Sequence, residues 1–367
     1  MTRTTLFMSE RRSLQSCTAE FGGEIDQDTQ KEFQFYMIYS TLSKEVRKEI
    51  GSQGDEFIKH CSFNGKACSV KTFVESQSLR YGNCFTFNQG SRNKTSPLIV
   101  SETEYWSGLE VTLELKYDEY MLFSDTVGAR VHIHDPNEPP SPDNYGIDIS
   151  SGFETSVAIM QTHEIRLASP YRDHCVNYSD EDPYRHSQSW CTRYCIQRIN
   201  YMKCGCADPT LTSTTIFKTC NLTNRNESCC LNEVLDRILK DKLACDCPLP
   251  CSTTYYGEKV SVARWPSKSL DFNGNLTKRN YLEDIKRMRK SQAKLRVFYS
   301  TLIRKIYEQK PRYQDSEIYS HLGGELGMWL GLTLMVIFEI IETSLYLIKY
   351  FIRFRANRKV KKLAICD

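Results

Sequence analysis

The chain has 367 residues, a formal net charge of +3 and a mean hydropathy of −0.48. This hydropathy excludes a polytopic membrane protein, and a content of 40% hydrophobic and 11% aromatic residues excludes an intrinsically disordered chain. The charge is too small to indicate nucleic-acid binding, so no nucleic-acid partner is expected. The length favours about two domains.

Alternation of apolar and polar side chains predicts strands, most clearly where Leu109, Val111 and Leu113 alternate with polar residues. Strands are predicted over residues 109–117, 129–134, 164–168, 254–263 and 295–301. Apolar residues at helical spacing predict helices over residues 191–203, 231–243 and 278–296. The chain therefore mixes strands and helices.

Fourteen of the 16 cysteines lie between Cys61 and Cys251. Such density indicates either a disulfide framework in an oxidising compartment or metal sites. Five N-glycosylation sequons between residues 93 and 277 favour the disulfide framework, and the C-x-x-C spacing typical of structural zinc is absent from the sequence. The acceptor asparagines are Asn93, Asn177, Asn221, Asn226 and Asn275.

Cys191 and Cys195 are four residues apart and so lie on one face of the predicted helix 191–203. The predicted helix 231–243 leads into Cys245 and Cys247. If the two segments run antiparallel, nested bridges Cys191–Cys247 and Cys195–Cys245 form a ladder between them. Such a ladder stiffens a two-helix lever.

Residues 327–348 form a segment long enough to span a bilayer, for which ~20 apolar residues suffice. Residues 349–367 carry a charge of +6, whereas the remainder of the chain carries −3. The positive-inside rule places this tail in the cytoplasm and the main body outside. The first 30 residues contain no apolar run of signal or spanning length, so we expect that the chain lacks its natural beginning.

Four small residues share one face of the predicted membrane helix, because Ser320, Gly324, Gly327 and Gly331 follow each other by 4, 3 and 4 residues. Small residues at this spacing also bring membrane helices together, so a packing face is the alternative to a functional one.

Packing does not explain why Glu339 and Glu342 lie in the same apolar segment. Intramembrane carboxylates usually face a bundle interior or a water-filled path. Continued as one regular helix, the small-residue face reaches Met335 and Glu342. A ring of such segments, with Gly331 and Thr333 midway, predicts a narrow, oxygen-lined cation path, which requires an oligomer.

The sequence evidence for a metal site or an active site is weaker. His132 and His134 on one strand face could bind a metal, but exposed strand histidines are the simpler interpretation. His163 begins a partial zinc-protease motif in which Leu167 stands at the second histidine position. The sequence contains no nucleophile elbow, P-loop or dinucleotide fingerprint. We therefore expect no enzyme, no metal and no cofactor.

Short motifs stand in a distinctive order along the chain. They are CSFNGKAC at 61–68, YGNCFTFN at 81–88, GARVHIHD at 128–135, WCTRYC at 190–195, CGC at 204–206, CDCPLPC at 245–251, RWPS at 264–267 and the segment 322–342. In this order and spacing they resemble the degenerin/epithelial sodium channel family, which includes acid-sensing and peptide-gated channels. The resemblance runs from about Tyr36 to the tail.

The resemblance implies an α+β fold with a disulfide-rich, hand-like ectodomain, in which a β palm and ball carry helical finger, thumb and knuckle regions, plus one C-terminal transmembrane helix. It implies a plasma-membrane protein that forms a homo- or heterotrimer with related subunits and conducts sodium. Protons, peptides, stretch and constitutive opening all occur on this scaffold, so the gating stimulus and any extracellular ligand stay open. The resulting division is a poorly matched segment 1–35, an extracellular domain 36–325, a pore-lining helix 326–348 and a cytoplasmic tail 349–367.

The resemblance also assigns roles to residues. The selectivity filter is Gly331, Leu332 and Thr333, where the family has Gly-x-Ser and where the helix can be broken in relatives. The gate and blocker region contains Ser320, Gly324 and Gly327, and bulky substitutions at the position of Ser320 hold such channels open. The pore acids are Glu339 and Glu342. Tyr171 is the aromatic contact that couples the thumb to the membrane helix.

The family's cysteine pairing includes the ladder and adds further bridges. These are Cys61–Cys68, Cys175–Cys251, Cys206–Cys220, and Cys204 with either Cys229 or Cys230. Cys84 is left over, because its counterpart in relatives pairs with a cysteine that follows a first membrane helix missing here. Cys17 lacks the matching context to replace that partner.

The expectation is thus a subunit of a trimeric, amiloride-sensitive, sodium-selective channel, with ligand gating as one of the gating modes that stay open. As a truncated subunit, it is expected to conduct no current alone. The alternative is a non-conducting, single-pass, cysteine-rich receptor or regulatory subunit.

Overall fold

The computed structural model describes residues 27–89, 97–120, 124, 126–136, 138, 140–178, 187–211, 217–240, 245–267, 278–331 and 333–363. Cys17, Asn93, Asn275 and Leu332 lie outside the described residues. The chain divides into two compact units, Met1–Glu308 and Gln309–Asp367.

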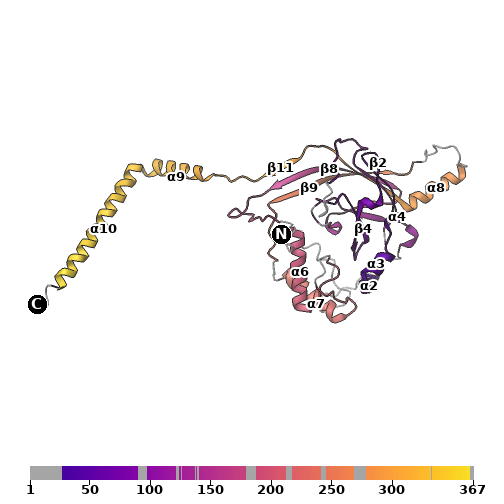
Figure 1. Ribbon diagram of the computed structural model, residues 1–367, viewed down its shortest axis with the longest axis horizontal. Coiled ribbons are helices and arrows are strands. Elements are labelled where there is room, and N and C mark those ends of the chain that lie inside the picture. The colour runs from indigo at the N-terminus through magenta and orange to yellow at the C-terminus, as the bar shows by residue number, and fades with distance from the viewer. Residues whose placement is uncertain are drawn as a thin grey trace. The chain divides into compact units, whose positions relative to one another are not determined.

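The first unit is built on a seven-stranded sheet in the order β11-β8-β10-β5-β1-β2, and β9 also pairs with β8 (Figure 1). Its strands are β1 (Ile58–Phe63), β2 (Lys66–Ala67), β5 (Leu109–Glu114), β8 (Phe153–Ile165), β9 (Ser252–Arg264), β10 (Gln292–Tyr299) and β11 (Lys305–Glu308). Two smaller sheets pair β3 (Phe73–Ser78) with β4 (Gly82–Phe87) and β6 (Gly128–Val131) with β7 (Ile147–Ser150).

The helices of the first unit are α2 (Gln27–Thr41), α3 (Lys44–Ile50), α4 (Gly54–Phe57), α5 (Pro142–Tyr145), α6 (Gln188–Cys204), α7 (Arg225–Lys240) and α8 (Lys278–Ser291). The second unit contains α9 (Asp315–Leu330) and α10 (Leu334–Leu363). Two single 3₁₀ turns, Val70–Thr72 and Tyr117–Glu119, complete the described elements.

The strand predictions at 109–117, 254–263 and 295–301 are confirmed as β5, β9 and β10. The prediction at 164–168 found only the end of β8, because small and hydroxyl residues such as Thr155 and Ser156 hide its alternation. The helix predicted over 278–296 is wrong at its end. It stops at Ser291 because the residues that follow pair with both β5 and β8.

One face of the large sheet forms the core of the unit. Its alternate side chains come from four neighbouring strands, and Val157 and Ala293 are 0% exposed. The other main members of this cluster are Ile58, Val111, Leu113, Ile159 and Leu295. Each fully buried aliphatic side chain contributes roughly 1.5–3 kcal/mol, so this face is the principal apolar contribution to folding.

The opposite face carries an ion-pair network across three strands. The ammonium of Lys294 lies 2.9 Å from Glu110 and 3.7 Å from Glu154, and the guanidinium of Arg296 pairs with the same two carboxylates. The Tyr105 hydroxyl donates to Glu154, and its ring lies 4.3 Å from the Arg296 guanidinium carbon. Burial raises the pKa of Glu154, but this hydrogen bond and the two cations outweigh it and hold the pKa below its usual value.

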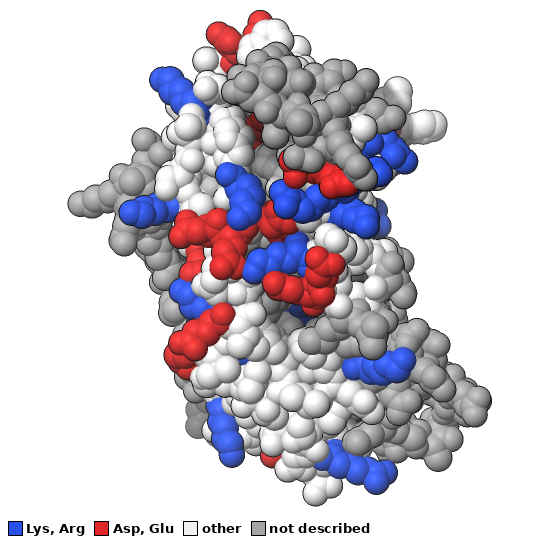
Figure 2. Space-filling model, turned by 90° about the vertical axis from the view of Figure 1, so that its right-hand side faces the viewer, with Lys and Arg blue, Asp and Glu red and all other residues white. Residues whose placement is uncertain are grey.

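Acidic and basic side chains are also interleaved over the surface that Figure 2 shows. No large area of a single sign is visible among the described residues on this face. Charges here are therefore compensated locally, and this face has no electrostatic footprint for a polyanion.

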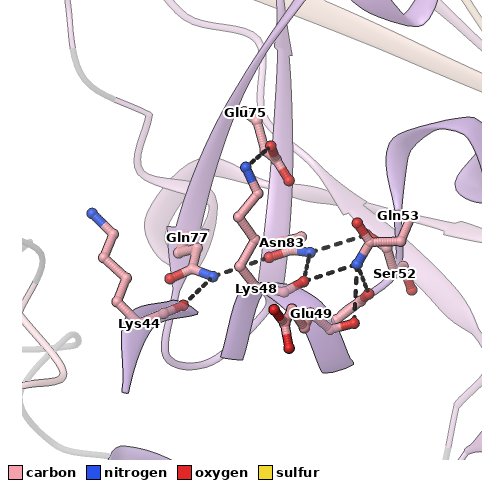
Figure 3. A network of polar contacts seen from close by, with 9 residues as sticks. Lys44, Lys48, Glu49, Ser52, Gln53, Glu75, Gln77 and Asn83 are labelled. Carbon is pink, nitrogen blue, oxygen red and sulfur yellow. Dashed lines mark hydrogen bonds and ion pairs between the residues drawn. The ribbon is translucent and has the colours of Figure 1, made fainter. Parts of the chain in front are cut away.

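Side-chain amides fasten the end of α3 to the β3–β4 hairpin (Figure 3). Asn83 and Gln53 both donate to the carbonyl of Lys48, at 2.9 and 2.8 Å. Gln77 donates to the side-chain oxygen of Asn83 at 3.3 Å, and the Lys48 ammonium lies 2.6 Å from Glu75. These bonds satisfy carbonyls that a helix end leaves without a partner inside the helix.

Six disulfides link the described parts of the first unit. They are Cys61–Cys68, Cys175–Cys251, Cys191–Cys247, Cys195–Cys245, Cys204–Cys230 and Cys206–Cys220. The nested ladder joins α6 to the segment that follows α7, and the Cys204–Cys230 bridge joins the two helices directly. The sulfur of Cys84, the residue left over by the family pairing, lies 3.8 Å from the carbonyl oxygen of Gly82.

Replacing Glu154 by glutamine is expected to lower the free energy of unfolding by about 1–3 kcal/mol, because Lys294 and Arg296 lose a charged partner where all these side chains are only 12–15% exposed. Urea denaturation of the oxidised protein at pH 7 measures the change. The matched control is Asp148→Asn, which removes an ion pair at a 73% exposed side chain and should cost less than ~0.5 kcal/mol. Equal, small effects of both changes would contradict the network.

Candidate functional site

The second unit places Gly331 and Thr333, the described residues of the predicted filter, at a break between α9 and α10. Gly331 ends α9 with a φ of +59°, a left-handed conformation that glycine adopts without strain. The hydroxyl of Thr333 accepts from the Val336 N–H at 3.4 Å, and its carbonyl accepts from the Ile337 N–H at 3.2 Å. Thr333 therefore caps the start of α10.

The regular helix over 327–348 that the spacing predicted is interrupted, because Gly331 stops one helix and Thr333 starts another. This is the break that the family resemblance allowed at the filter. Ser316–Trp329 and Leu334–Arg355 are bent by 83° relative to each other. Among the described residues, no one helix has both the length and the apolar composition to cross a membrane, and this bent pair meets those criteria only when taken together.

The break separates the residues that sequence spacing placed on one face. Ser320, Gly324 and Gly327 lie on α9, whereas Glu339 and Glu342 lie on α10, so the small-residue face does not continue to the acids. All five positions are exposed. A Cβ added at Gly324 would have no neighbour within 4 Å, so this side of α9 leaves room for another helix to approach.

Tyr171 lies in the loop that follows β8, and it is 41% exposed. The loop is closed by hydrogen bonds from the Tyr171 N–H to the Ala168 carbonyl at 3.2 Å and from the His174 N–H to the Tyr171 carbonyl at 3.1 Å. The Cys175–Cys251 disulfide ties it to the residues that lead into β9. Three segments thus meet at one end of β8, where β11 also pairs.

The strand predicted over 129–134 should have contained His132 and His134. Both residues instead follow β6, which ends at Val131. Their rings stack at 5.2 Å, and the Nδ1 of His132 accepts from the Ser141 N–H at 3.0 Å. Burial first, then the charges of His134 and Arg193, lower the pKa of His132 to about 4. His132 is therefore held neutral and hydrogen-bonded in a packed position.

One group among the described residues brings three metal-ligating side chains together, namely Cys206, Cys220 and Glu227. The two sulfurs are joined in a disulfide and so are not thiolate ligands. Glu227 instead accepts the Asn221 N–H at 2.7 Å.

Three of the predicted glycosylation acceptors fall within the described residues. Asn177, Asn221 and Asn226 are all exposed, as an acceptor must be. The side-chain oxygen of Asn221 accepts from the Thr223 hydroxyl at 2.7 Å, so this sequon is closed into a turn.

A family model described as the amiloride-sensitive sodium channel matches residues 3–343. The match starts within the segment 1–35, for which the sequence motifs gave no assignment.

The chain is 30% identical to degenerin mec-10 of Caenorhabditis elegans over 329 residues, which is 87% of this chain and 45% of that protein. It is 29% identical to degenerin-like protein asic-1 of the same species, covering 89% of this chain and 40% of the relative. It is 28% identical to epithelial sodium channel subunit gamma-2 of Xenopus laevis, covering 83% and 48%. The chain spans somewhat less than half the length of these relatives.

Replacing Gly331 by alanine is expected to straighten the α9–α10 pair, because alanine in the left-handed region costs roughly 1–2 kcal/mol while it favours a continuous helix. Gly331→Asn should keep the break, since asparagine tolerates this conformation. Spin-label distances between Tyr319 and Leu347 positions, measured in lipid nanodiscs, should lengthen for the alanine variant only. The matched control is Gly323→Ala within α9, and unchanged distances in all variants would refute the role of Gly331.

Acidification should destabilise the first unit between pH 6.5 and about 4. In the unfolded chain His132 takes up a proton near its ordinary pKa of about 6.5, whereas in the folded chain its pKa is about 4. The stability that is present above pH 6.5 is therefore lost as the pH falls from 6.5 toward 4. Melting temperatures at pH 7 and 5 measure the loss. His132→Gln should reduce this pH dependence and the exposed-site control His60→Gln should not; the reverse pattern would exclude His132 as the cause.

Proposed function

Because the chain belongs to the amiloride-sensitive sodium channel family, we propose that it is a subunit of a sodium-selective, amiloride-sensitive channel of the plasma membrane. Proteins of this family are ion channels and not enzymes. Related subunits of this family assemble into multimers, and the proposed assembly is a trimer of this chain, alone or with relatives.

The break between α9 and α10 is the observation that carries the proposal. The last turn of a helix presents carbonyl oxygens without partners inside the helix, and Thr333, two residues after the C-cap Gly331, adds a hydroxyl oxygen. Three copies around one axis would give a ring of oxygens that replaces the hydration shell of a cation. Gly331 permits the close approach of backbones that such a ring needs.

The flanking residues take roles on either side of this ring. Ser320, Gly324 and Gly327 form the narrow, small-residue wall of the gate and blocker region on α9. Glu339 and Glu342, three residues apart on α10, add negative charge beyond the filter and so raise the local cation concentration. Their exposure in the single chain suits side chains that face a central path in an assembly.

The orientation proposed is a hand-like, disulfide-rich body outside the cell and a basic C-terminus inside. Among the described residues, six disulfides and three exposed sequons support an extracellular body. The +6 charge of residues 349–367 supports a cytoplasmic end for α10. The bent helix pair would cross the bilayer between them.

The Na⁺/K⁺ permeability ratio tests the filter. Thr333→Ala should lower this ratio toward one, because it removes the hydroxyl oxygen, whereas Thr333→Ser should preserve it. Reversal potentials of amiloride-blockable currents in oocytes, recorded with the chain expressed alone and with epithelial sodium channel subunits, measure the ratio.

The matched control is Thr343→Ala on α10, whose hydroxyl donates to the Glu339 carbonyl at 2.7 Å and is satisfied within its own helix. This change should leave the ratio unaltered. Currents whose selectivity responds equally to both threonines, or to neither, would rule out the proposed filter.

A further inference from the structure

The guanidinium of Arg166 sits where the end of β8 meets the start of β9. Its Nη1 donates to the Pro250 carbonyl and to the Thr253 hydroxyl, both at 3.0 Å. Its Nη2 donates to the Glu164 carboxylate and, at 3.3 Å, to the Tyr255 hydroxyl. The side chain is only 11% exposed, so these four acceptors replace most of its hydration.

The main chain of the same residue closes the junction. The Arg166 N–H donates to the Cys251 carbonyl at 2.7 Å. Val176, at the far end of the Tyr171 loop, exchanges backbone hydrogen bonds with Leu249 and Cys251, each at 3.0 Å. Together with the Cys175–Cys251 disulfide, these bonds make the loop and the residues before β9 one block.

The block is continuous with the last strand of the first unit. Glu164 and Ile165 of β8 pair in parallel with Tyr307 and Glu308 of β11. Glu308 is the final residue of the unit, and α9 begins at Asp315. Arg166, its ion-pair partner Glu164 and the β8–β11 hydrogen bonds thus connect β11 with the residues that lead from the α6–α7 disulfide ladder into β9.

We propose that Arg166 is a positioning residue for gating, which locks the Tyr171 loop, the start of β9 and β11 into one rigid transmission block. It touches no permeant ion and acts through the backbone it holds. A planar guanidinium can serve two acceptors on each of two nitrogens, and a lysine ammonium at this position cannot reach both pairs with the same geometry. This inference rests on the proposed channel function, because it assigns the block's movement to the pore.

Reciprocity supplies a test that does not need the stimulus. If the loop biases the pore, then opening the pore must change the loop by the same coupling. Ser320→Phe is the opening change, because bulky residues at this position are expected to hold the channel open. Mass spectrometry measures hydrogen exchange of residues 168–176 and 305–308 on the full chain in nanodiscs. Each of three chains, with Arg166 unchanged, Arg166→Gln or Arg166→Lys, is compared with and without Ser320→Phe.

The expected result has two parts. Arg166→Gln speeds exchange of both segments about tenfold or more, since it deletes charge-assisted hydrogen bonds. Ser320→Phe changes the hydrogen exchange of residues 168–176 when Arg166 is present. Arg166→Gln abolishes this change, whereas Arg166→Lys restores it in part. The matched control is Arg130→Gln, which removes a half-buried arginine paired with Asp148 at 2.7 Å outside the block and should leave the change intact.

Amiloride-blockable sodium current in oocytes that co-express the chain with epithelial sodium channel subunits separates the outcomes, since the chain alone is expected to conduct no current. One outcome is that Ser320→Phe gives current and the loop still responds in the Arg166→Gln background. This outcome overturns the positioning role, because an arginine with a merely structural role would alter exchange but not the loop response. The proposed channel function is then unaffected. Current with no loop response in any background overturns the positioning role as well. If neither the current nor the loop response is observed, the proposed function and the inference are both overturned.

Discussion

The backbone hydrogen bonds of β8 are the interaction on which the rest of the body depends. All 13 residues of this strand pair with β9, and the opposite edge of β8 carries first β10 and then β11. Strand β10 in turn pairs with β5 and so completes the buried face around Val157 and Ala293. One strand therefore joins the core, the return from the disulfide ladder and the exit toward the second unit.

Different parts of the first unit are stiffened by different interactions. The ladder of Cys191–Cys247 and Cys195–Cys245 makes the α6–α7 region stiff without enlarging the hydrophobic core. The ion-pair network around Arg296 holds β5, β8 and β10 in register on the polar face. Stiff parts joined by one strand can move as bodies, and such motion is how small local changes become large displacements.

The proposed pore segment has the opposite feature, a break between two helices. Backbone polar groups in a bilayer must be satisfied, and irregular backbone is tolerated there only where it lines a protein-enclosed or water-filled space. A break at Gly331 and Thr333 within the apolar stretch is thus costly in lipid and useful in a cation path. The same two residues that end and begin a helix supply the oxygens that the proposed filter requires.

Local patterns predicted the parts of this protein whose chemistry is local. Strand β5 was readable because apolar residues on one face alternate with Glu110, Thr112 and Glu114 on the other, whereas β8 was not, because its buried positions include Thr155 and Ser156. The stop and start signals at Gly331 and Thr333 were present in the sequence, but the uniform apolarity on both sides favoured one long helix. The contacts of Arg166 with Pro250, Thr253 and Tyr255 join residues 84 to 89 positions apart, and no spacing rule reaches that far.

In the channel that we propose, the break between α9 and α10 lines the ion path. The most direct test of this placement is the accessibility of a cysteine introduced at Thr333 to external Cd²⁺, recorded as current through the assembled channel. Micromolar Cd²⁺ should block the Thr333→Cys channel and leave the unsubstituted channel unaffected. A Thr333→Cys channel that conducts sodium and ignores Cd²⁺ would contradict this placement.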